Sequence, residues 1–166
     1  MRRITLLRHA KSDWGNPALD DFDRPLNPRG ERNLGLIGKR LKNSGVRPSL
    51  ILSSDAVRAI TTARAIAQEI GYPKEFIQPA PELYLASPAT ILEVLVREGS
   101  EYNDVMIVGH NPGLTELANH ICTTPIDNIP TCGVFAVDAN IADWSDLASN
   151  RNPPAFFDYP KKTGVS

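Results

Sequence analysis

Short apolar runs alternate along the chain with longer stretches in which apolar residues recur every three or four positions. The first pattern is typical of buried β-strands, and the second is typical of amphipathic helices. Strands are predicted near residues 4–7, 49–54, 76–78, 104–110, 134–138 and 155–159, and helices near residues 28–45, 56–71, 88–98 and 114–122. This alternation favours an α/β fold with a mainly parallel sheet that helices cover on both faces.

Local signals support several helix boundaries. Asn27 can cap a helix whose first position is Pro28, and Gly45 follows the end of the same apolar pattern. Gly71 ends the next helical stretch in the same way. For the last two strands, antiparallel pairing at an edge of the sheet remains open.

The bulk composition narrows the class of protein. A chain of 166 residues fits one domain, 1–166, and its net charge of −1 gives no electrostatic reason to expect a nucleic acid or a membrane as partner. No segment approaches the roughly 18 apolar residues of a membrane span, and the basic start lacks the apolar length of a signal peptide. We therefore expect a cytoplasmic protein in which Cys122 and Cys132 are reduced and buried.

Three separate strands deliver unusual polar residues to one edge of the predicted sheet. Arg8 and His9 follow the first strand, Arg58 lies in the first turn of the helix after the second strand, and His110 follows the strand near residues 104–109. Ligands of such sheets bind beyond the carboxyl ends of the strands. Each residue alone has an ordinary structural explanation, but together they are expected to face one another.

Such a cluster of cationic and imidazole side chains predicts a bound anion. Two cations near a helix N-terminus repel the positive end of its dipole and each other, and two planar guanidinium groups with imidazoles suit a tetrahedral phosphoryl group. The chain has no P-loop, no dinucleotide-binding glycine motif and no carboxylate cluster for magnesium. Its three histidines lack zinc-ligand spacing, and neighbouring arginines oppose a bound cation. No metal or other cofactor is expected.

The candidate nucleophile is an imidazole, because no serine or cysteine lies in a nucleophile motif. A neutral ring nitrogen of His9 can attack phosphorus if the other nitrogen donates its hydrogen to a fixed acceptor. Arg8, Arg58 and His110 would then stabilise the charge of the transferred group. Water would complete the cycle by hydrolysing phospho-His9.

Four segments, LLRHAKS, DRPLNPRG, LILSSDAVRAITTA and VGHNP, occur in this order along the chain. They resemble the histidine phosphatase superfamily, and within it the small phosphohistidine phosphatases of the SixA type. The resemblance covers residues 4–120, with a weaker similarity in FFDYPKK. It implies a three-layer α/β/α sandwich of the phosphoglycerate-mutase-like kind. The superfamily often has glycine after the Arg-His pair, where this chain, like the SixA-type branch, has alanine.

The resemblance also implies roles for individual residues. His9 corresponds to the phosphorylated nucleophile, and Arg8, Arg58 and His110 correspond to phosphate-binding residues. Many relatives supply a carboxylate as proton donor, and here Glu82 in the segment ELYL is a candidate for that role or for substrate binding. The alternative is that Glu82 is a solvated loop carboxylate, and in another register Leu85 occupies the position of the usual acid.

Two further groups of polar residues lie near these motifs. Ser12, one turn beyond His9, can donate to a phosphate oxygen or serve as an ordinary loop residue. Asp20, Asp21 and Asp23 form an acidic loop, which is normally solvated and could also contact a basic partner.

These observations predict a metal-independent phosphatase that acts through a phosphohistidine intermediate. A site short of a proton-donating acid favours phosphohistidine, whose imidazole is a good leaving group, so the expected substrate is a phosphohistidine-bearing signalling or phosphotransfer protein. The alternatives are a small-molecule phosphomonoesterase or mutase-like enzyme, which would act on a small phosphorylated substrate, and a non-catalytic phosphate-binding module. The oligomeric state is not predicted.

Overall fold

The computed structural model describes residues 1–162 and is built around a six-stranded sheet with the strand order β3-β2-β4-β1-β5-β6. Strands β3, β2, β4 and β1 run parallel, β5 is antiparallel to β1, and β6 is antiparallel to β5. The strands are β1 Arg2–Arg8, β2 Leu50–Ser53, β3 Gln78–Pro79, β4 Asp104–Gly109, β5 Val134–Ala139 and β6 Pro154–Asp158.

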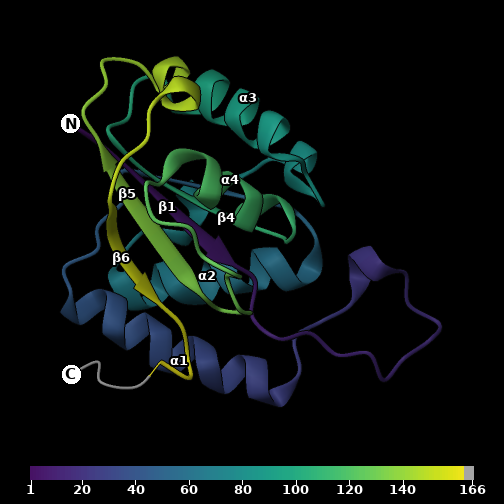
Figure 1. Ribbon diagram of the computed structural model, residues 1–166. Coiled ribbons are helices and arrows are strands. Elements are labelled where there is room, and N and C mark those ends of the chain that lie inside the picture. Colours follow the sequence, from purple (N-terminus) through teal and green to yellow (C-terminus); the bar gives the residue numbers. More distant parts are fainter. Residues whose placement is uncertain (163–166) are drawn as a thin grey trace.

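Helices cover both faces of this sheet (Figure 1). Helices α1 and α2 lie on one face, and α3, α4 and the 3-10 helix near the C-terminus lie on the other. The helices are α1 Pro28–Asn43, α2 Val57–Ile70, α3 Pro88–Gly99 and α4 Gly113–Ile121, with 3-10 helices at Asp21–Asp23, Lys74–Phe76, Pro81–Leu83 and Trp144–Ser149. The fold is therefore the expected α/β class with helical layers on both sides of a mixed, mostly parallel sheet.

Side chains that point alternately to the two faces of the sheet form two separate hydrophobic cores. In β1, Leu6 packs with the core under α3 and α4, whereas Leu7 packs with the core under α1 and α2. Both side chains are fully buried. Successive side chains of a strand point to opposite faces, so a strand covered on both sides has apolar residues at every position. This explains why the strand-like runs of the sequence are continuously apolar.

Most predicted elements are confirmed, and both C-terminal strands are antiparallel as the sequence left open. The strand predicted at 76–78 is wrong in its placement: residues 74–76 form a 3-10 helix, and β3 is only Gln78–Pro79. Pro79 has no backbone N–H and so limits pairing at this edge of the sheet. The 3-10 helix Trp144–Ser149 was not predicted.

No helix within residues 1–162 combines the length and the apolar character needed to cross a bilayer.

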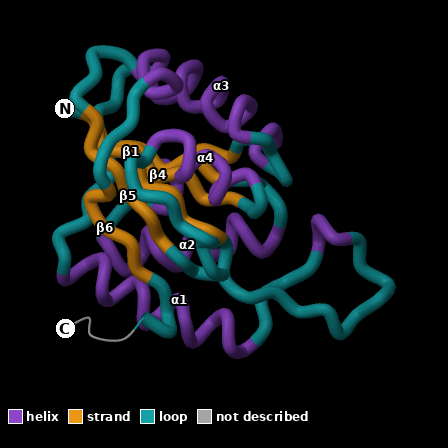
Figure 2. Tube along the Cα trace, viewed as in Figure 1, coloured by secondary structure: helices purple, strands orange, loops and turns teal. Residues whose placement is uncertain are grey.

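The chain between β1 and α1 forms a long loop that extends away from the sheet (Figure 2). The second half of this loop is hydrogen-bonded to the segment directly after β1. Asn27 N–H donates to Lys11 O at 3.0 Å, and Asp13 N–H donates to Pro25 O at 2.8 Å.

Helix α1 approaches the segment after His9 very closely. At Gly30, an added Cβ would lie 2.2 Å from the backbone oxygen of Lys11. Only glycine fits this approach, and the Gly30 N–H also donates to the capping side chain, to Asn27 Oδ1 at 2.7 Å. The first turn of α1 therefore sets the position of the backbone immediately after His9.

Replacing Gly30 with alanine should displace that backbone. Gly30→Ala is expected to lower the free energy of unfolding by about 1–3 kcal/mol, as overpacking does, and to reduce phosphatase activity through the shift next to His9. Gly35→Ala on the same helix is the matched control, because an added Cβ there meets nothing within 4 Å. That control should be stabilising by about 0.5–1 kcal/mol. Chemical denaturation would measure both, and equal effects would contradict the close-approach account.

Candidate active site

A pocket of about 240 Å³ lies beyond the carboxyl ends of β1 and β4. The structure brings Arg8, His9, Arg58 and His110 together in its lining, as the sequence predicted. The ring centroids of the two histidines are 5.2 Å apart. The remaining lining residues are Lys11, Ser12, Trp14, Arg24, Leu85, Asn111 and Thr131.

His9 is held so that one ring nitrogen faces the other polar side chains of the pocket. Its Nδ1 lies 2.7 Å from the backbone oxygen of Ala10, and since a carbonyl only accepts, Nδ1 carries the hydrogen. Nε2 therefore carries no hydrogen and keeps its lone pair. The Ala10 N–H in turn donates to Thr62 Oγ1 at 2.9 Å, which ties this segment to α2.

Arg58 lies beside His9, and each of its three guanidinium nitrogens forms a hydrogen bond. Its Nε donates to His9 Nε2 at 3.4 Å, its Nη1 donates to Asp21 O at 2.7 Å, and its Nη2 pairs with Asp21 Oδ2 at 2.9 Å. The side chain is only 3% exposed. The bidentate hold on Asp21 orients the guanidinium group and leaves its bond to His9 as the long one.

Asp21 links three side chains of the site. It also pairs with Arg24, at 3.0 Å between Nη2 and Oδ1, and accepts a hydrogen bond from the Tyr84 hydroxyl. The hydrogen bond from Tyr84 and the two arginines lower the pKa of Asp21 to about 2. The expectation of a merely solvated acidic loop is thus wrong for Asp21, because its carboxylate is the counter-charge of the buried Arg58.

His110 is positioned by the end of β2. Its Nε2 lies 2.8 Å from Ser54 Oγ, and Ser54 Oγ already accepts from Ala56 N–H at 3.2 Å. The serine hydroxyl can therefore donate its own hydrogen to Nε2, which places a hydrogen on Nδ1. Within residues 1–162 that Nδ1 is buried without a hydrogen-bond partner.

Arg8 has a similarly incomplete set of partners. Its Nη1 donates to Ile129 O at 3.0 Å, while its Nε is buried without a partner among the described residues. Burial lowers the pKa of this guanidinium group. A buried polar group without a partner is destabilising. Arg8 Nε and His110 Nδ1 are therefore two donors of the lining that an oxyanion could satisfy.

Both imidazoles are neutral in the free protein. Burial, together with the neighbouring arginines, lowers the pKa of His9 to about 4. Burial, followed by the His9 ring, lowers the pKa of His110 to about 3. The positive charge of the pocket is therefore carried by its arginines and Lys11, and His9 Nε2 is unprotonated at neutral pH.

Ser12 lies in the pocket lining, but its main contact is with protein. Its Oγ accepts a hydrogen bond of 2.7 Å from Arg24 Nη1, which leaves its own hydrogen for another acceptor. The Arg24 guanidinium group also stacks on the ring of Trp14, 3.4 Å from its centroid. Trp14 is 76% exposed and forms the rim of the pocket on the side of the long loop.

Glu82 was expected as a possible acid or substrate-binding residue, but the structure does not bring it to the pocket lining. Its exposed carboxylate pairs with Arg97 at 2.6 Å, on the surface beside α3. The 3-10 helix Pro81–Leu83 directs the Glu82 side chain away from the pocket, and Leu85 lines the pocket instead. Within residues 1–162, no aspartate or glutamate lines this pocket.

Several residues of the site were not predicted from the sequence. Arg24 lies inside the motif DRPLNPRG, and its proximity to Asp21 at three residues' distance was a usable signal. Tyr84, which contacts Asp21 and packs edge-on against His110, carried no such signal. Asn111 follows His110 directly and so reaches the same edge as the sequence indicates, whereas Thr131 reaches the pocket only through the fold.

Other groups in the described part of the chain do not suggest a metal site. Residues 1–162 contain no cluster of three or more His, Cys, Asp or Glu side chains suited to a metal ion. Cys122 and Cys132 are buried and unpaired, and burial raises the pKa of the Cys132 thiol to about 12. The absence of a metal in the reaction stays a prediction.

The lowered pKa values of His9 and His110 predict a specific response to acid. Between about pH 6.5, where free histidine titrates, and pH 4, the unfolded chain binds protons that the folded protein does not. Stability should therefore be full above pH 6.5 and should fall as the pH drops toward 4. Imidazole NMR titration, with His9→Gln and His110→Gln for assignment, should show both rings neutral at pH 6. Midpoints near 6.5 would contradict this.

Asp21 should be needed for activity although it does not line the pocket. Asp21→Asn removes the charge that orients Arg58, so kcat/KM for an aryl phosphate should fall about tenfold, equivalent to ~1.4 kcal/mol. Asp23→Asn is the control, since Asp23 is exposed in the same 3-10 helix and has no side-chain partner within the described residues. Steady-state kinetics would compare the variants. Equal losses would show that Asp21 has no special role.

Comparisons with known proteins agree with this geometry. Residues 4–83 match the histidine phosphatase superfamily (branch 1). The chain is 37% identical over 151 residues to an uncharacterized protein of Mycobacterium tuberculosis, covering 85% of this chain and 91% of that protein.

Two solved structures are similar over almost the whole chain. The SixA-type protein of Agrobacterium tumefaciens has a TM-score of 0.80 and 30% identity, covering 96% of this chain and 98% of that one. The protein histidine phosphatase SixA in complex with tungstate has a TM-score of 0.77 and 20% identity, covering 95% and 97%. The fold is thus phosphoglycerate-mutase-like. Sequence, fold and pocket together place this chain in branch 1 of the histidine phosphatase superfamily, which indicates phosphatase activity.

Proposed function

We propose that this protein removes the phosphoryl group from phosphohistidine on a signalling or phosphotransfer protein, through a phosphorylated His9. The observation that carries the proposal is the unprotonated His9 Nε2 in a pocket that also contains Arg8, Arg58 and His110. The superfamily supports the phosphatase reaction, and the SixA-like fold supports the substrate class.

In the first step, His9 Nε2 attacks phosphorus. The bond from phosphorus to the substrate nitrogen breaks, and its electron pair stays on the departing imidazole. The Nδ1–H of His9 stays bonded to Ala10 O, which fixes the tautomer and accommodates the positive charge that forms on the ring. In the second step, a water oxygen attacks the phosphorus of phospho-His9 and the bond from phosphorus to Nε2 breaks. The electron pair of that bond returns to Nε2, and both water protons leave with the product as dihydrogen phosphate.

The remaining residues stabilise the transferring group. Arg8 Nε and His110 Nδ1 are buried donors without a partner within residues 1–162, and Arg58 can exchange its long bond to His9 for a phosphoryl oxygen. Preorganised donors of this kind dominate catalysis of phosphoryl transfer. A related SixA structure holds tungstate, a tetrahedral oxyanion of similar shape, which supports an oxyanion site in the same fold.

The choice of substrate rests on the leaving group. An alcohol must receive a proton as it departs, but no carboxyl group from residues 1–162 lines the pocket, and the pKa of His110 is about 3. A phosphohistidine that is protonated on its free nitrogen leaves as neutral imidazole and needs no acid from the enzyme. The site is therefore better suited to P–N than to P–O bonds.

A substrate panel tests this proposal. The wild-type protein should dephosphorylate a phosphohistidine phosphotransfer protein with a kcat/KM at least about 100-fold above that for phosphoserine peptides or sugar phosphates, since only the latter need a proton donor. His9→Gln should lose at least about 1000-fold in activity. Labelling should place an acid-labile phosphoryl group on His9.

Other results of this panel would support a different function or contradict the proposed nucleophile. Comparable turnover of sugar phosphates would indicate a small-molecule phosphomonoesterase. Binding of phosphate without turnover of any substrate would indicate a non-catalytic module. A phosphoryl label that persists in His9→Gln would contradict the proposed nucleophile. Glu82→Gln serves as a surface control and should retain wild-type rates, because its carboxylate lies outside the pocket.

A further inference from the structure

A second cavity of about 230 Å³ lies directly beside the catalytic pocket. Lys11 and Thr131 line both cavities, so the two share a wall. We call this second cavity the basic groove. Its lining residues are Lys11, Arg29, Asn33, Pro130, Thr131, Tyr159, Pro160 and Lys161.

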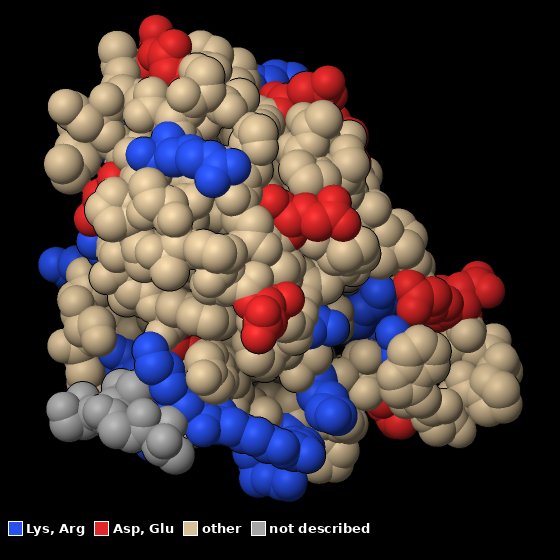
Figure 3. Space-filling view, in the orientation of Figure 1, with Lys and Arg blue, Asp and Glu red and all other residues tan. Residues whose placement is uncertain are grey.

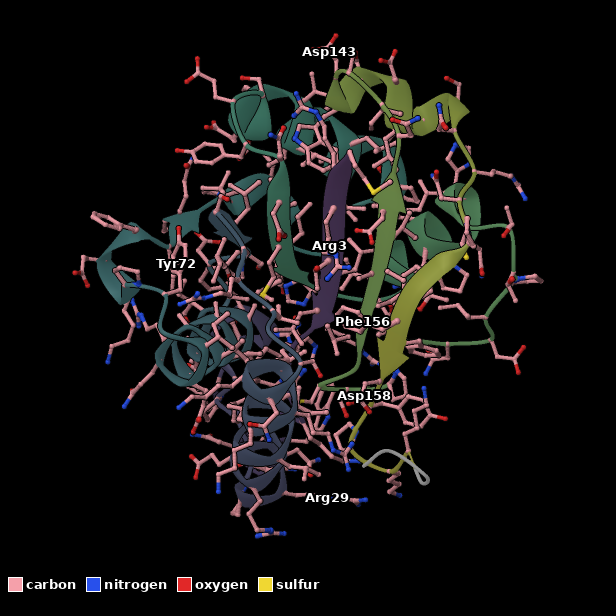
Figure 4. The ribbon with its side chains drawn as sticks, turned by 90° about the vertical axis from the view of Figure 1, so that its left-hand side faces the viewer. Arg3, Arg29, Tyr72, Asp143, Phe156 and Asp158 are labelled. Atoms are coloured by element: carbon pink, nitrogen blue, oxygen red, sulfur yellow. The ribbon has the colours of Figure 1, made fainter. Side chains whose placement is uncertain are left out.

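The basic groove is assembled from three distant parts of the chain. Arg29 lies in the first turn of α1, and Pro130 and Thr131 precede β5. The third wall is the segment after β6, which Arg40 holds against α1 by pairing with Asp158 at 3.1 Å and donating to Tyr159 O at 3.2 Å. Figure 4 shows Arg29 at the end of α1 and Asp158 at the end of β6, on the same side of the molecule.

The charges of this groove are not compensated by the described protein. Lys11, Arg29 and Lys161 are exposed and form no ion pair within residues 1–162, and no acidic residue from that part of the chain lines the groove. Figure 3 shows Lys and Arg side chains gathered over α1, while most acidic side chains of this face lie elsewhere. The net charge of the whole chain is −1, so the basic groove is a local feature.

The position of Arg29 is unfavourable in the absence of a ligand. It lies in the first turn of a 16-residue helix, where the dipole is positive and a cation is destabilising. Together with Lys11 and Lys161 it forms a cluster of like charges. An anionic ligand would relieve both effects, and the N-terminus of α1 would add to its attraction.

The apolar walls indicate what kind of anion fits. Pro130, Tyr159 and Pro160 lie between the cationic residues, which suits a ligand that offers chain atoms to pack as well as carboxylates to pair. A lone phosphate would use the cations but not the tyrosine and prolines. A peptide segment containing Asp or Glu uses both, and it is continuous with a phosphohistidine in the neighbouring pocket.

We propose that the basic groove binds an acidic stretch of the substrate protein next to its phosphohistidine, so that the enzyme selects phosphohistidines with acidic surroundings. This inference rests on the proposed function and adds a substrate class to it. Charges at the rim of an interface act chiefly on association and on its salt dependence. The basic groove should therefore affect KM and leave the chemical step unchanged.

Two peptides with the same phosphohistidine test the inference, one with Asp and Glu beside it and one with Asn and Gln. The wild type should show a kcat/KM roughly tenfold higher for the acidic peptide, with the difference lost as NaCl is raised. Arg29→Glu combined with Lys161→Glu should remove this preference through KM, at unchanged kcat. Glutamate in the first turn of a helix is favourable, so folding should be preserved.

The matched control reverses two exposed cations elsewhere. Lys39→Glu with Arg64→Glu makes the same change in net charge, and neither residue lines the basic groove or the catalytic pocket. This control should keep the preference for the acidic peptide. Equal rates for the two peptides in the wild type, or equal losses in both double variants, would overturn the inference while leaving the proposed function intact. If wild type hydrolyses neither peptide, the proposed function itself fails, and the inference fails with it.

Discussion

A fully buried cation is destabilising when it is unpaired, and the ion pair between Arg58 and Asp21 provides a negative partner at the centre of this site. Arg58 contacts His9 directly, so the carboxylate of Asp21 determines where the cation beside the nucleophile lies. Tyr84 and Arg24 bind the same carboxylate from other sides. The result is a positive pocket that remains folded when no phosphate is present. Because Asp21 stands outside the lining, it pairs with the arginines while the described lining itself contains no carboxylate.

The parallel part of the sheet explains why this arrangement is possible. β1, β2 and β4 end at one edge, and each is followed by a loop or helix start that carries one part of the site. The backbone oxygens of Ala10 and Ile129 orient His9 and Arg8. The side-chain hydroxyl of Ser54, directly after β2, orients His110. Each side chain is thereby restricted before any ligand arrives, which is the preorganisation that phosphoryl transfer requires.

The two cavities divide the recognition of a substrate between them. The catalytic pocket has buried donors without partners and lacks a carboxylic acid among its described lining residues, so it is suited to a phosphoryl group on a good leaving group. The basic groove combines exposed cations with proline and tyrosine, which suits a length of protein chain. The exposed Trp14 also lines the catalytic pocket, stacked on Arg24. A substrate with a protein surface around its phosphohistidine could contact all three.

The sequence alone determined the order and type of nearly all main elements, because apolar periodicity reports which faces of a strand or helix are buried. It also brought Arg8, His9, Arg58 and His110 to one edge, since residues after parallel strands share that edge whatever the details of packing. The tertiary structure alone decided the partners of those residues. Asp21 meets Arg58 across 37 positions of the chain, and Glu82 turns toward Arg97 at the surface. Loop residues have no periodicity, so the place of Asp21, Trp14 or Lys161 depends on how whole elements pack, and only the folded chain settles it.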